Sequence, residues 1–329
     1  MDVFLTGGTG FIGQALMRAM KRRGWRVRVL VRNPDGAPAR WLQRQGAELV
    51  AGDVTADGPW MRELGNCQLL LHNAGVYEIG ADAATARRMA EVNVGGTERV
   101  LGAAHAAQVP RTLYVSTVWA LGGSGRAGTP SQPQDETHRH DGFHPTPYAR
   151  SKFDAHEVAL RWRQRGLPLV TALPNAVVGA NDHAIFGYLL RLQMLGALPP
   201  VGFGGDSVMA CVDVDALADG LCRAGERAPV GADYLFCGER AETRALFARW
   251  TQLTGRHGMG VYLPRGLMRP QMALAEPLLR AFGLPAFLSR EAVDTTRCHL
   301  DYSSAKAQRE LGWVHPTFDA LWPPIVEAE

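Results

Sequence analysis

The sequence predicts an α/β protein built around a doubly wound parallel sheet. From the start of the chain to about residue 173, short apolar runs alternate with segments of helical length, which is the pattern of repeated βα units. In addition, the first apolar run passes through a glycine-rich turn at residues 6–13 directly into a helical segment. We therefore expect helices on both faces of one parallel sheet, with ligands bound beyond the carboxyl ends of its strands.

The expected elements follow from the alternation. Strands are predicted at Val3–Leu5, Val27–Val31, Glu48–Ala51, Leu69–His72, Thr112–Ser116 and Leu169–Ala172. Helices are predicted near residues 11–23, 38–45, 59–64, 82–108 and 146–165. The segment 122–147 mixes Gly, Ser, Pro, His and Asp without a period, which predicts a long surface loop. After residue 173 the alternation loosens because prolines interrupt it.

The turn at residues 6–13 indicates a dinucleotide site. Gly7 permits a tight turn, Gly10 lets phosphates approach the backbone, and Gly13 lets the helix pack closely on the strand. The unpaired N–H groups and the positive end of the helix dipole suit a pyrophosphate. The segment predicts a Rossmann fold that binds NAD(P), with the following residues at the cofactor: Thr6, Gly7, Gly10, Phe11, Ile12 and Gly13.

We expect the chain to divide into two parts. A dinucleotide-binding domain spans residues 1–173, with a return segment at about 207–235. A smaller, mixed α/β substrate-binding region comprises residues 174–206 and 236–329. Within this region, residues 267–288 are rich in Leu, Met and Ala but are interrupted by charges and prolines. They predict a helix that packs on the core or on a partner rather than a membrane anchor.

Composition excludes several functional classes. With 329 residues and 46% hydrophobic content, the chain can bury a substantial core. Its 35 basic and 32 acidic residues form no basic arm, so we expect no nucleic-acid partner. Five well-separated cysteines argue against a metal site and for a reduced, cytoplasmic protein. Neither a spanning helix nor a secretion signal is expected.

The end of the second predicted strand indicates which dinucleotide is preferred. A protein that prefers NAD usually presents a carboxylate there to the ribose hydroxyls. This chain has Arg32, whose guanidinium suits the 2′-phosphate of NADP(H), and Arg40 is a candidate to assist it. We expect NADP(H) to be preferred, with NAD(H) possible. The alternative is that Arg32 is an ordinary solvated arginine.

Tyr148 and Lys152 are the main candidates for proton transfer. Their four-residue spacing at the start of a predicted helix places both on one face. An ammonium group nearby favours the phenolate, so we expect Lys152 to lower the pKa of Tyr148 and make it a usable acid or base. Lys152 can also hydrogen-bond a nicotinamide ribose. A purely structural role for the pair is the alternative.

Two further polar residues are predicted near this pair. Thr117 follows the fifth predicted strand and is expected to hydrogen-bond a substrate oxygen where charge develops, with Ser116 as a competitor for that role. A turn or capping role is the alternative. Asn93 lies inside a predicted helix, where asparagine is unfavourable. Its side chain either holds a water that links Lys152 to solvent or satisfies a helix kink locally.

Taken together, these motifs resemble the extended short-chain dehydrogenase/reductase family, specifically its dihydroflavonol reductase-like and epimerase-like bacterial members. The resemblance covers nearly the whole chain and includes residues 52–53, 72–75, 174–175 and 303–313. It implies a catalytic set of Thr117, Tyr148 and Lys152, with Asn93 in support. It also implies a homodimer that pairs the helices near 82–108 and 146–165. Finally, it implies cofactor contacts from Asp53, Val54, Asn73, Ala74, Gly75, Tyr148, Lys152, Pro174 and Asn175.

The chain departs from the sugar-nucleotide members of that family at two places. Val118 and Trp119 follow Thr117 where the dehydratases carry an Asp-Glu pair, so dehydration lacks its acid and base. Leu173 precedes Pro174 where many sugar-nucleotide enzymes have an arginine, which weakens the case for a diphosphosugar. These departures favour a reductase.

The expected function is NADP(H)-dependent reduction of a carbonyl, or oxidation of the alcohol, in a small substrate that is aromatic or lipid-like. Four aromatic residues are candidates to line its pocket, with ordinary packing as the alternative: Tyr77, Trp119, Phe143 and Phe186. Two other functions stay open. One is an NAD-dependent sugar or sugar-nucleotide epimerase, and the other is a non-catalytic redox sensor that binds a dinucleotide.

Overall fold

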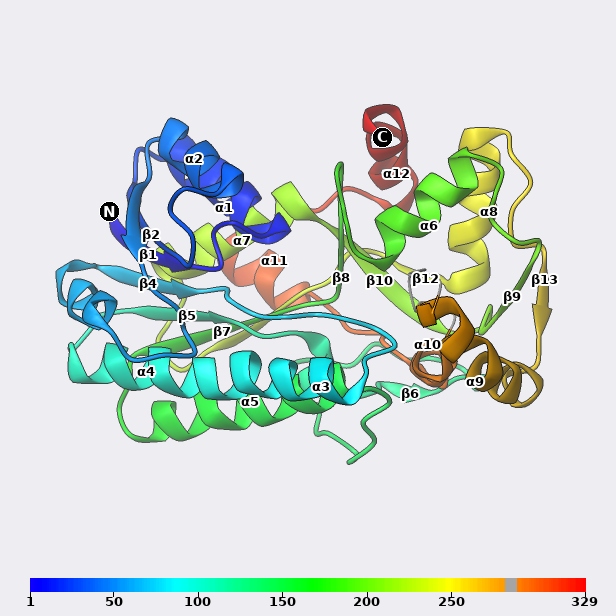
Figure 1. Cartoon of the computed structure of the whole chain (residues 1–329), viewed down its shortest axis with the longest axis horizontal. Helices are drawn as coiled ribbons and strands as arrows, with labels where there is room; N and C mark the ends of the chain where they lie inside the picture. Colours follow the sequence, from blue (N-terminus) through cyan, green and yellow to red (C-terminus); the bar gives the residue numbers. More distant parts are fainter. Residues whose placement is uncertain (282–288) are drawn as a thin grey trace.

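The computed structural model, which describes residues 1–281 and 289–329, is organised around a seven-stranded sheet (Figure 1). The strand order is β11-β7-β5-β4-β1-β2-β3, and every neighbouring pair is parallel. The order reverses between β1 and β4, which is where a doubly wound sheet opens a crevice for ligands. The predicted fold class is confirmed. The strands are β1 (Asp2–Thr6), β2 (Arg26–Val31), β3 (Glu48–Ala51), β4 (Leu69–His72), β5 (Thr112–Val115), β7 (Leu169–Pro174) and β11 (Asp233–Phe236).

Helices cover both faces of this sheet (Figure 1). On one face, α1 (Phe11–Arg22) and α7 (Val214–Arg227) pack against each other and enclose an apolar core with α2 (Ala37–Arg44) and α11 (Ala305–Leu311). On the other face, α4 (Thr97–Ala106) packs against α5 (Pro147–Gln164) over a second core. The sheet is therefore buried on both sides, as a parallel sheet requires.

The strands and helices predicted for the first half of the chain are present, but some differ in their ends or in helix type. All six strands appear with ends that shift by at most two residues, and β11 is an additional strand. The helix expected at 59–64 is a 3₁₀ helix over Pro59–Asn66. The helix expected at 82–108 is interrupted: α3 (Ala83–Ala90) and α4 are joined by a π-helical stretch over Glu91–Gly96. A shorter 3₁₀ turn covers Val118–Ala120. In the segment expected to be a long loop, the described strand is the two-residue β6 (Gly125–Arg126), which pairs with β14 (Cys298–His299).

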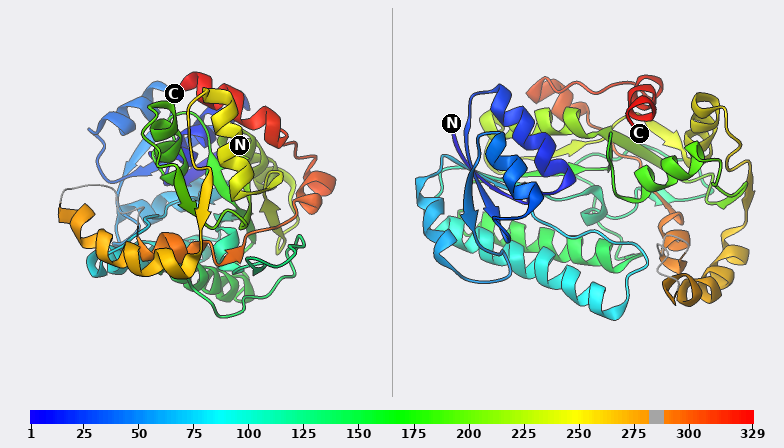
Figure 2. Two further views of the ribbon diagram at one scale, coloured as in Figure 1. Left: turned by 90° about the vertical axis from the view of Figure 1, so that its right-hand side faces the viewer. Right: turned by 45° about the horizontal axis from the view of Figure 1, so that its top comes forward.

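A smaller region lies at the end of the molecule far from the N-terminus (Figure 2). Its main sheet is mixed, because β10 (Val208–Asp213) runs parallel to β8 (Ala176–Val178) and antiparallel to β12 (Arg240–Glu242). The parallel pair β9 (Val201–Phe203) and β13 (Val261–Leu263) lies beside it. The helices of this region are α6 (Ile185–Met194), α8 (Thr243–Thr254), α9 (Arg265–Ala281), α10 (Arg290–Thr295) and α12 (Phe318–Ala328). Of the helix predicted at 267–288, residues 282–288 lie outside the described residues. The division of the chain at residue 173 stays a prediction.

The cysteines serve as core residues. All five are buried and free. Burial raises the pKa of each thiol, to about 11 for Cys67 and about 12 for Cys211, so the reactive thiolate is disfavoured. Within the residues that the structure describes, no helix has the length and apolar character needed to cross a membrane.

A chain of hydrogen bonds joins β1, β4 and α4 at the carboxyl edge of the sheet. The Thr6 hydroxyl accepts bonds from the N–H groups of Asn73 and Ala74, at 3.2 and 3.1 Å, and lies 2.8 Å from His72 Nδ1. Because this oxygen already accepts twice, it donates its own proton to Nδ1, which leaves the ring proton on Nε2. His72 Nε2 then donates to Thr97 Oγ1 at 3.1 Å, and Thr97 donates to the Asn93 carbonyl at 2.6 Å.

This arrangement predicts that His72 stays neutral, with its proton on Nε2, well into the acid range. Burial, assisted by the positive charge of Lys152, lowers the pKa of His72 to about 3. A histidine in the unfolded chain has a pKa of about 6.5. The stability that this neutral ring contributes is therefore complete above about pH 6.5 and is lost as the pH falls toward 3. Long-range ¹H–¹⁵N spectra of histidine-labelled protein check this. An imidazolium signal for His72 at pH 5 would contradict it.

Gly13→Ala is expected to destabilise the protein. A Cβ at this position would lie 2.2 Å from the Gly7 carbonyl oxygen and 2.6 Å from Gly8 Cα, and neither backbone atom can move without reshaping the turn. Overpacking of this kind costs about 1–3 kcal/mol, which urea unfolding measures. Gly65→Ala is the matched control, because an added Cβ there meets no described atom within 4 Å. Equal losses in the two variants would argue against a packing role for Gly13.

Candidate active site

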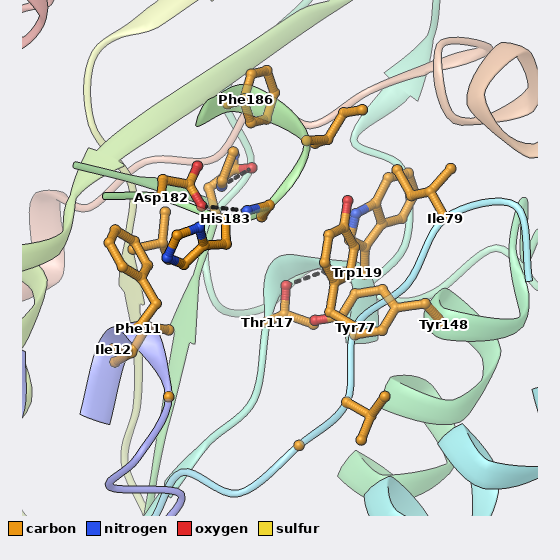
Figure 3. A pocket seen from close by; sticks show the side chains of 18 of the residues that line it. Phe11, Ile12, Tyr77, Ile79, Thr117, Trp119, Tyr148, Asp182, His183 and Phe186 are labelled. Carbon is orange, nitrogen blue, oxygen red and sulfur yellow. Dashed lines mark hydrogen bonds between the residues drawn. The ribbon is translucent and has the colours of Figure 1, made fainter. Parts of the chain in front are cut away.

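A cavity of about 860 Å³ opens above the carboxyl ends of β1, β4 and β5 and continues into the smaller region. One half of its lining comes from the glycine turn and the loops that follow β2, β3 and β4, together with Thr117, Trp119 and Tyr148. The other half comes from residues after 174 (Figure 3). The cavity therefore spans the topological switch point of the sheet, where this class of fold binds its ligand.

The glycine turn has the geometry of a phosphate-binding loop. Gly7 has a φ of +72°, and a Cβ on it would lie 2.7 Å from the backbone of Asn73 and Ala74, so only glycine fits. Gly10 precedes α1, and no side chain in the described residues caps the first N–H groups of that helix. Gly7, Gly10, Phe11 and Ile12 line the cavity. Thr6 and Gly13 are buried beneath it and shape the turn from below.

The loops after β2 and β3 hold the residues predicted to bind the adenosine part of the cofactor. Arg32, Asp53 and Val54 line the cavity there. Asp53 is fixed in place, since its Oδ1 accepts bonds from the N–H and the hydroxyl of Thr55, both at 2.9 Å. Arg32 is exposed. Arg40 is not among the lining residues, because its guanidinium bonds the backbone carbonyl of Asp35.

Two further sets of predicted cofactor residues lie near the middle of the cavity. Asn73, Ala74 and Gly75, which follow β4, all line it. Asn175 lines it as well, and its side chain donates to the Leu300 carbonyl at 2.8 Å and accepts from the N–H of Ala176 at 2.9 Å. Pro174 is buried as the last residue of β7 and is not part of the lining.

Tyr148 and Thr117 meet at the centre of the cavity. Thr146 caps α5, accepting from the N–H of Ala149 at 3.0 Å, which places Tyr148 in the first turn of that helix. The Tyr148 hydroxyl points toward Thr117, at the end of β5, whose own hydroxyl accepts from the N–H of Trp119 at 3.5 Å (Figure 3). Ser116, the competitor for the role of Thr117, is buried, and its hydroxyl has no partner among the described residues. Of the two hydroxyls, only that of Thr117 lies on the cavity surface.

Lys152 lies behind this pair rather than on the cavity surface. Its ammonium group donates to the Val115 carbonyl at 3.2 Å and lies 5.2 Å from the centre of the Tyr114 ring. Burial raises the pKa of Tyr148 above its ordinary value, although the positive charge of Lys152 and the Thr117 hydroxyl both lower it. Lys152 thus lowers the pKa of Tyr148 as predicted, but the expected low pKa of the phenol is wrong, because desolvation of the phenolate outweighs the ammonium.

Asn93 explains the π-helical stretch between α3 and α4. Its Nδ2 donates to the Val76 carbonyl and to Ser151 Oγ, both at 2.9 Å, and its Oδ1 accepts from the N–H of Val76 at 2.8 Å. Both amide protons are thus occupied by protein, which disfavours the interpretation that they hold a water. Ser151 in turn donates to the Tyr148 carbonyl at 2.9 Å. Asn93 therefore joins the loop after β4 to the first turn of α5.

The half of the cavity that faces the smaller region is mainly apolar. Tyr77, Trp119 and Phe186 converge on it as predicted (Figure 3). The Tyr77 ring contacts the Tyr148 ring edge-on, with 4.6 Å between centroids and 80° between planes. Phe143 lines a different surface, where its ring lies 5.2 Å from the guanidinium of Arg297, so its predicted place in this pocket is wrong. The remaining apolar lining includes Ile79, Leu189, Phe203, Val208, Met209, Phe247, Met259 and Leu300.

Sequence reasoning missed several polar lining residues. Arg18 of α1 lines the cofactor half and pairs with Asp215 at 3.0 Å. Asp182 and His183 lie between the two halves, in the segment before α6. An acidic residue just before an apolar helical run is a capping signal that the sequence does contain. The sequence holds no comparable signal for the lining role of His183.

Comparison with known proteins agrees with this geometry. The model of the NAD dependent epimerase/dehydratase family matches residues 3–236. A ketoreductase of Stigmatella aurantiaca, named for 4-hydroxy-2-methyl-3-oxo-4-farnesyl-3,4-dihydroquinoline-1-oxide, is 29% identical, with 95% of this chain and 92% of the relative covered. A relative from Synechocystis that is named for dihydroflavonol 4-reductase is 28% identical over 94% of this chain and 89% of its own.

Among solved structures, the crystal structure of gox2253 is similar to this one with a TM-score of 0.81. It is 28% identical, and the match covers 99% of this chain and 97% of that one. The family match extends from β1 to β11 and so includes the whole parallel sheet together with the Tyr148 helix. The chain therefore belongs to the NAD dependent epimerase/dehydratase family and is an NAD(P)-dependent enzyme of the extended short-chain dehydrogenase/reductase type.

Proposed function

We propose that this enzyme is an NADP(H)-dependent carbonyl reductase, or alcohol dehydrogenase in the reverse direction, that acts on neutral and largely apolar substrates. One observation carries the proposal. Tyr148, whose hydroxyl points toward Thr117, and Thr117 itself line the cavity where the glycine-turn half meets the apolar half. A carbonyl oxygen bound at that point has one proton donor and one orienting hydroxyl within reach.

Tyr148, Thr117 and Lys152 have separate roles in the proposed reaction. The nicotinamide cofactor, when bound, supplies or accepts the hydride. Tyr148 gives its proton to the carbonyl oxygen in the reducing direction, while Thr117 orients that oxygen. Because burial raises its pKa, the phenol is protonated at neutral pH and ready to act as an acid. The ammonium of Lys152 then stabilises the negative charge left on Tyr148.

The apolar half of the cavity supports a neutral substrate. The charged side chains in the described lining are Arg18, Arg32, Asp53 and Asp182. Arg32 and Asp53 follow β2 and β3 on the adenosine side, and Arg18 pairs with Asp215 at 3.0 Å. The carboxylate of Asp182 accepts from the N–H groups of Ala184 and Gly187 at 2.7 and 3.0 Å, so it is already used inside the fold. The described apolar half thus offers no fixed cation for a diphosphosugar, and we place the reductase ahead of the epimerase.

The names of the relatives agree with this substrate class. The Stigmatella ketoreductase is named for a ketone that carries a farnesyl group. Tyr77, of which 43% is exposed in the structure, presents its ring to the cavity beside Tyr148. An aromatic wall next to the proton donor suits a planar or unsaturated group next to the carbonyl.

Tyr148→Phe is expected to lower kcat for carbonyl reduction by about 10²- to 10⁴-fold and to leave the Kd of NADPH nearly unchanged, because only the proton donor is lost. Consumption of NADPH with a panel of aryl and long-chain ketones measures the rate. Full turnover by Tyr148→Phe would refute the proposed role.

In the wild-type enzyme, the rate of alcohol oxidation is expected to rise with pH, since the raised pKa of Tyr148 keeps the phenolate scarce at neutral pH.

The nucleotide that the purified protein releases on denaturation separates the two enzyme classes. Exchangeable NADPH is the result expected for the reductase. Tightly retained NAD, together with activity on a sugar nucleotide, would instead establish the epimerase. Reduction of any ketone in the panel would exclude a sensor without activity.

Arg32→Ala is expected to weaken NADPH binding by about 10-fold or more and to leave NADH binding nearly unchanged, since a charge-assisted bond to the 2′-phosphate is worth about 1.5–3 kcal/mol. Calorimetric titration with both nucleotides measures the two affinities. Arg40→Ala is the matched control, because that guanidinium bonds a backbone carbonyl outside the lining. An equal loss for NADPH and NADH in Arg32→Ala would show that Arg32 does not select the phosphate.

A further inference from the structure

The segment between β8 and α6, residues 179–184, forms a wall of the cavity opposite the start of α1. Of these residues, 180–184 line the cavity. A Cβ on Gly179 would come within 3.3 Å of the Phe11 ring, which shows how closely the segment approaches the glycine turn. Cofactor bound on α1 would therefore have this segment on its other side.

A network of hydrogen bonds ties the segment to the smaller region. Asn181 has a φ of +61°, and its N–H donates to the carboxylate of Glu329, the residue after α12, at 2.8 Å. The other oxygen of that carboxylate accepts from Arg191 of α6 at 2.9 Å, and Arg191 also donates to the Asp182 carbonyl at 2.9 Å. The segment is thus tied to two helices of the smaller region, so side chains on it are presented from a fixed backbone.

Within this segment the two titratable side chains differ in burial. The Asp182 carboxylate is almost fully buried and caps α6. His183, the next residue, is exposed and lines the cavity. Figure 3 shows the His183 ring next to Phe11, the first residue of α1, and both residues line the cavity. The imidazole therefore lies on the side of the cavity where the proposed function places the diphosphate.

We propose that His183 donates a hydrogen bond to the diphosphate of the bound dinucleotide and completes a clamp whose other side is the N-terminus of α1. An imidazole keeps an N–H donor in either charge state. The arginines of the described lining are placed for other tasks, because Arg18 pairs with Asp215 and Arg32 follows β2 at the adenosine side. The inference rests on the dinucleotide binding contained in the proposed function, not on the choice of substrate.

A series of nucleotide fragments tests this contact. NADPH and 2′-phospho-ADP-ribose contain the diphosphate, whereas adenosine 2′-monophosphate lacks it. His183→Ala is expected to raise the Kd of the first two by about 10-fold or more, the size of a hydrogen bond to a charged group, and to leave that of the third unchanged. His183→Gln, which keeps an N–H donor, is expected to recover part of the loss. Calorimetric titration gives the values.

The controls separate this inference from the proposed function. His257→Ala removes an exposed histidine that is not part of the lining and is expected to change none of the three affinities. If the wild-type protein binds NADH in preference to NADPH, the proposed preference for NADP(H) is wrong. The contact of His183 with the diphosphate is then tested with the corresponding series of NADH, ADP-ribose and adenosine. An equal loss for all three ligands, or no loss for any, in a variant with an unchanged melting temperature would overturn the role of His183.

Discussion

The hydroxyl of Thr6 is the contact on which the cofactor half of the site depends. It ends β1, accepts from two successive N–H groups after β4 and donates to His72, so it fixes the two central strands at the edge where they diverge. Gly7 follows at once, and its missing side chain is the space that Asn73 and Ala74 occupy. A buried hydroxyl with all its bonds made therefore determines how closely the two loops approach.

The same network reaches the proposed catalytic residues. From His72 it passes through Thr97 to the carbonyl of Asn93, and the Asn93 side chain bonds both Val76 and Ser151. Val76 precedes Tyr77, and Ser151 bonds the carbonyl of Tyr148. Tyr77 and Tyr148, the proposed proton donor, are thus positioned by one set of internal hydrogen bonds. The π-helical stretch is the local deformation that lets Asn93 reach both partners.

Burial and the charge of Lys152 have opposite effects on the pKa of Tyr148. Enclosing Tyr148 in the apolar half of the cavity raises its pKa, and Lys152 opposes this without lying on the cavity surface. The result favours a protonated phenol, and that is the form needed to reduce a carbonyl. The substrate half contributes shape more than charge, because Asp182 is used to cap α6. Selectivity would then rest on apolar contacts contributed by α6, β9, β10 and α8.

The sequence by itself determined the parallel sheet, the glycine turn and the pairing of Tyr148 with Thr117. These features depend on periodicity, on residues a few positions apart, and on the rule that parallel strands end at one edge. Only the tertiary structure decided that β11 completes the sheet, that Phe143 lies outside the pocket, that Asn93 bonds Val76 and Ser151, and that burial outweighs Lys152 at Tyr148. Each of these depends on groups brought together from distant parts of the chain and on how much water their packing excludes. A local sequence pattern contains neither kind of information.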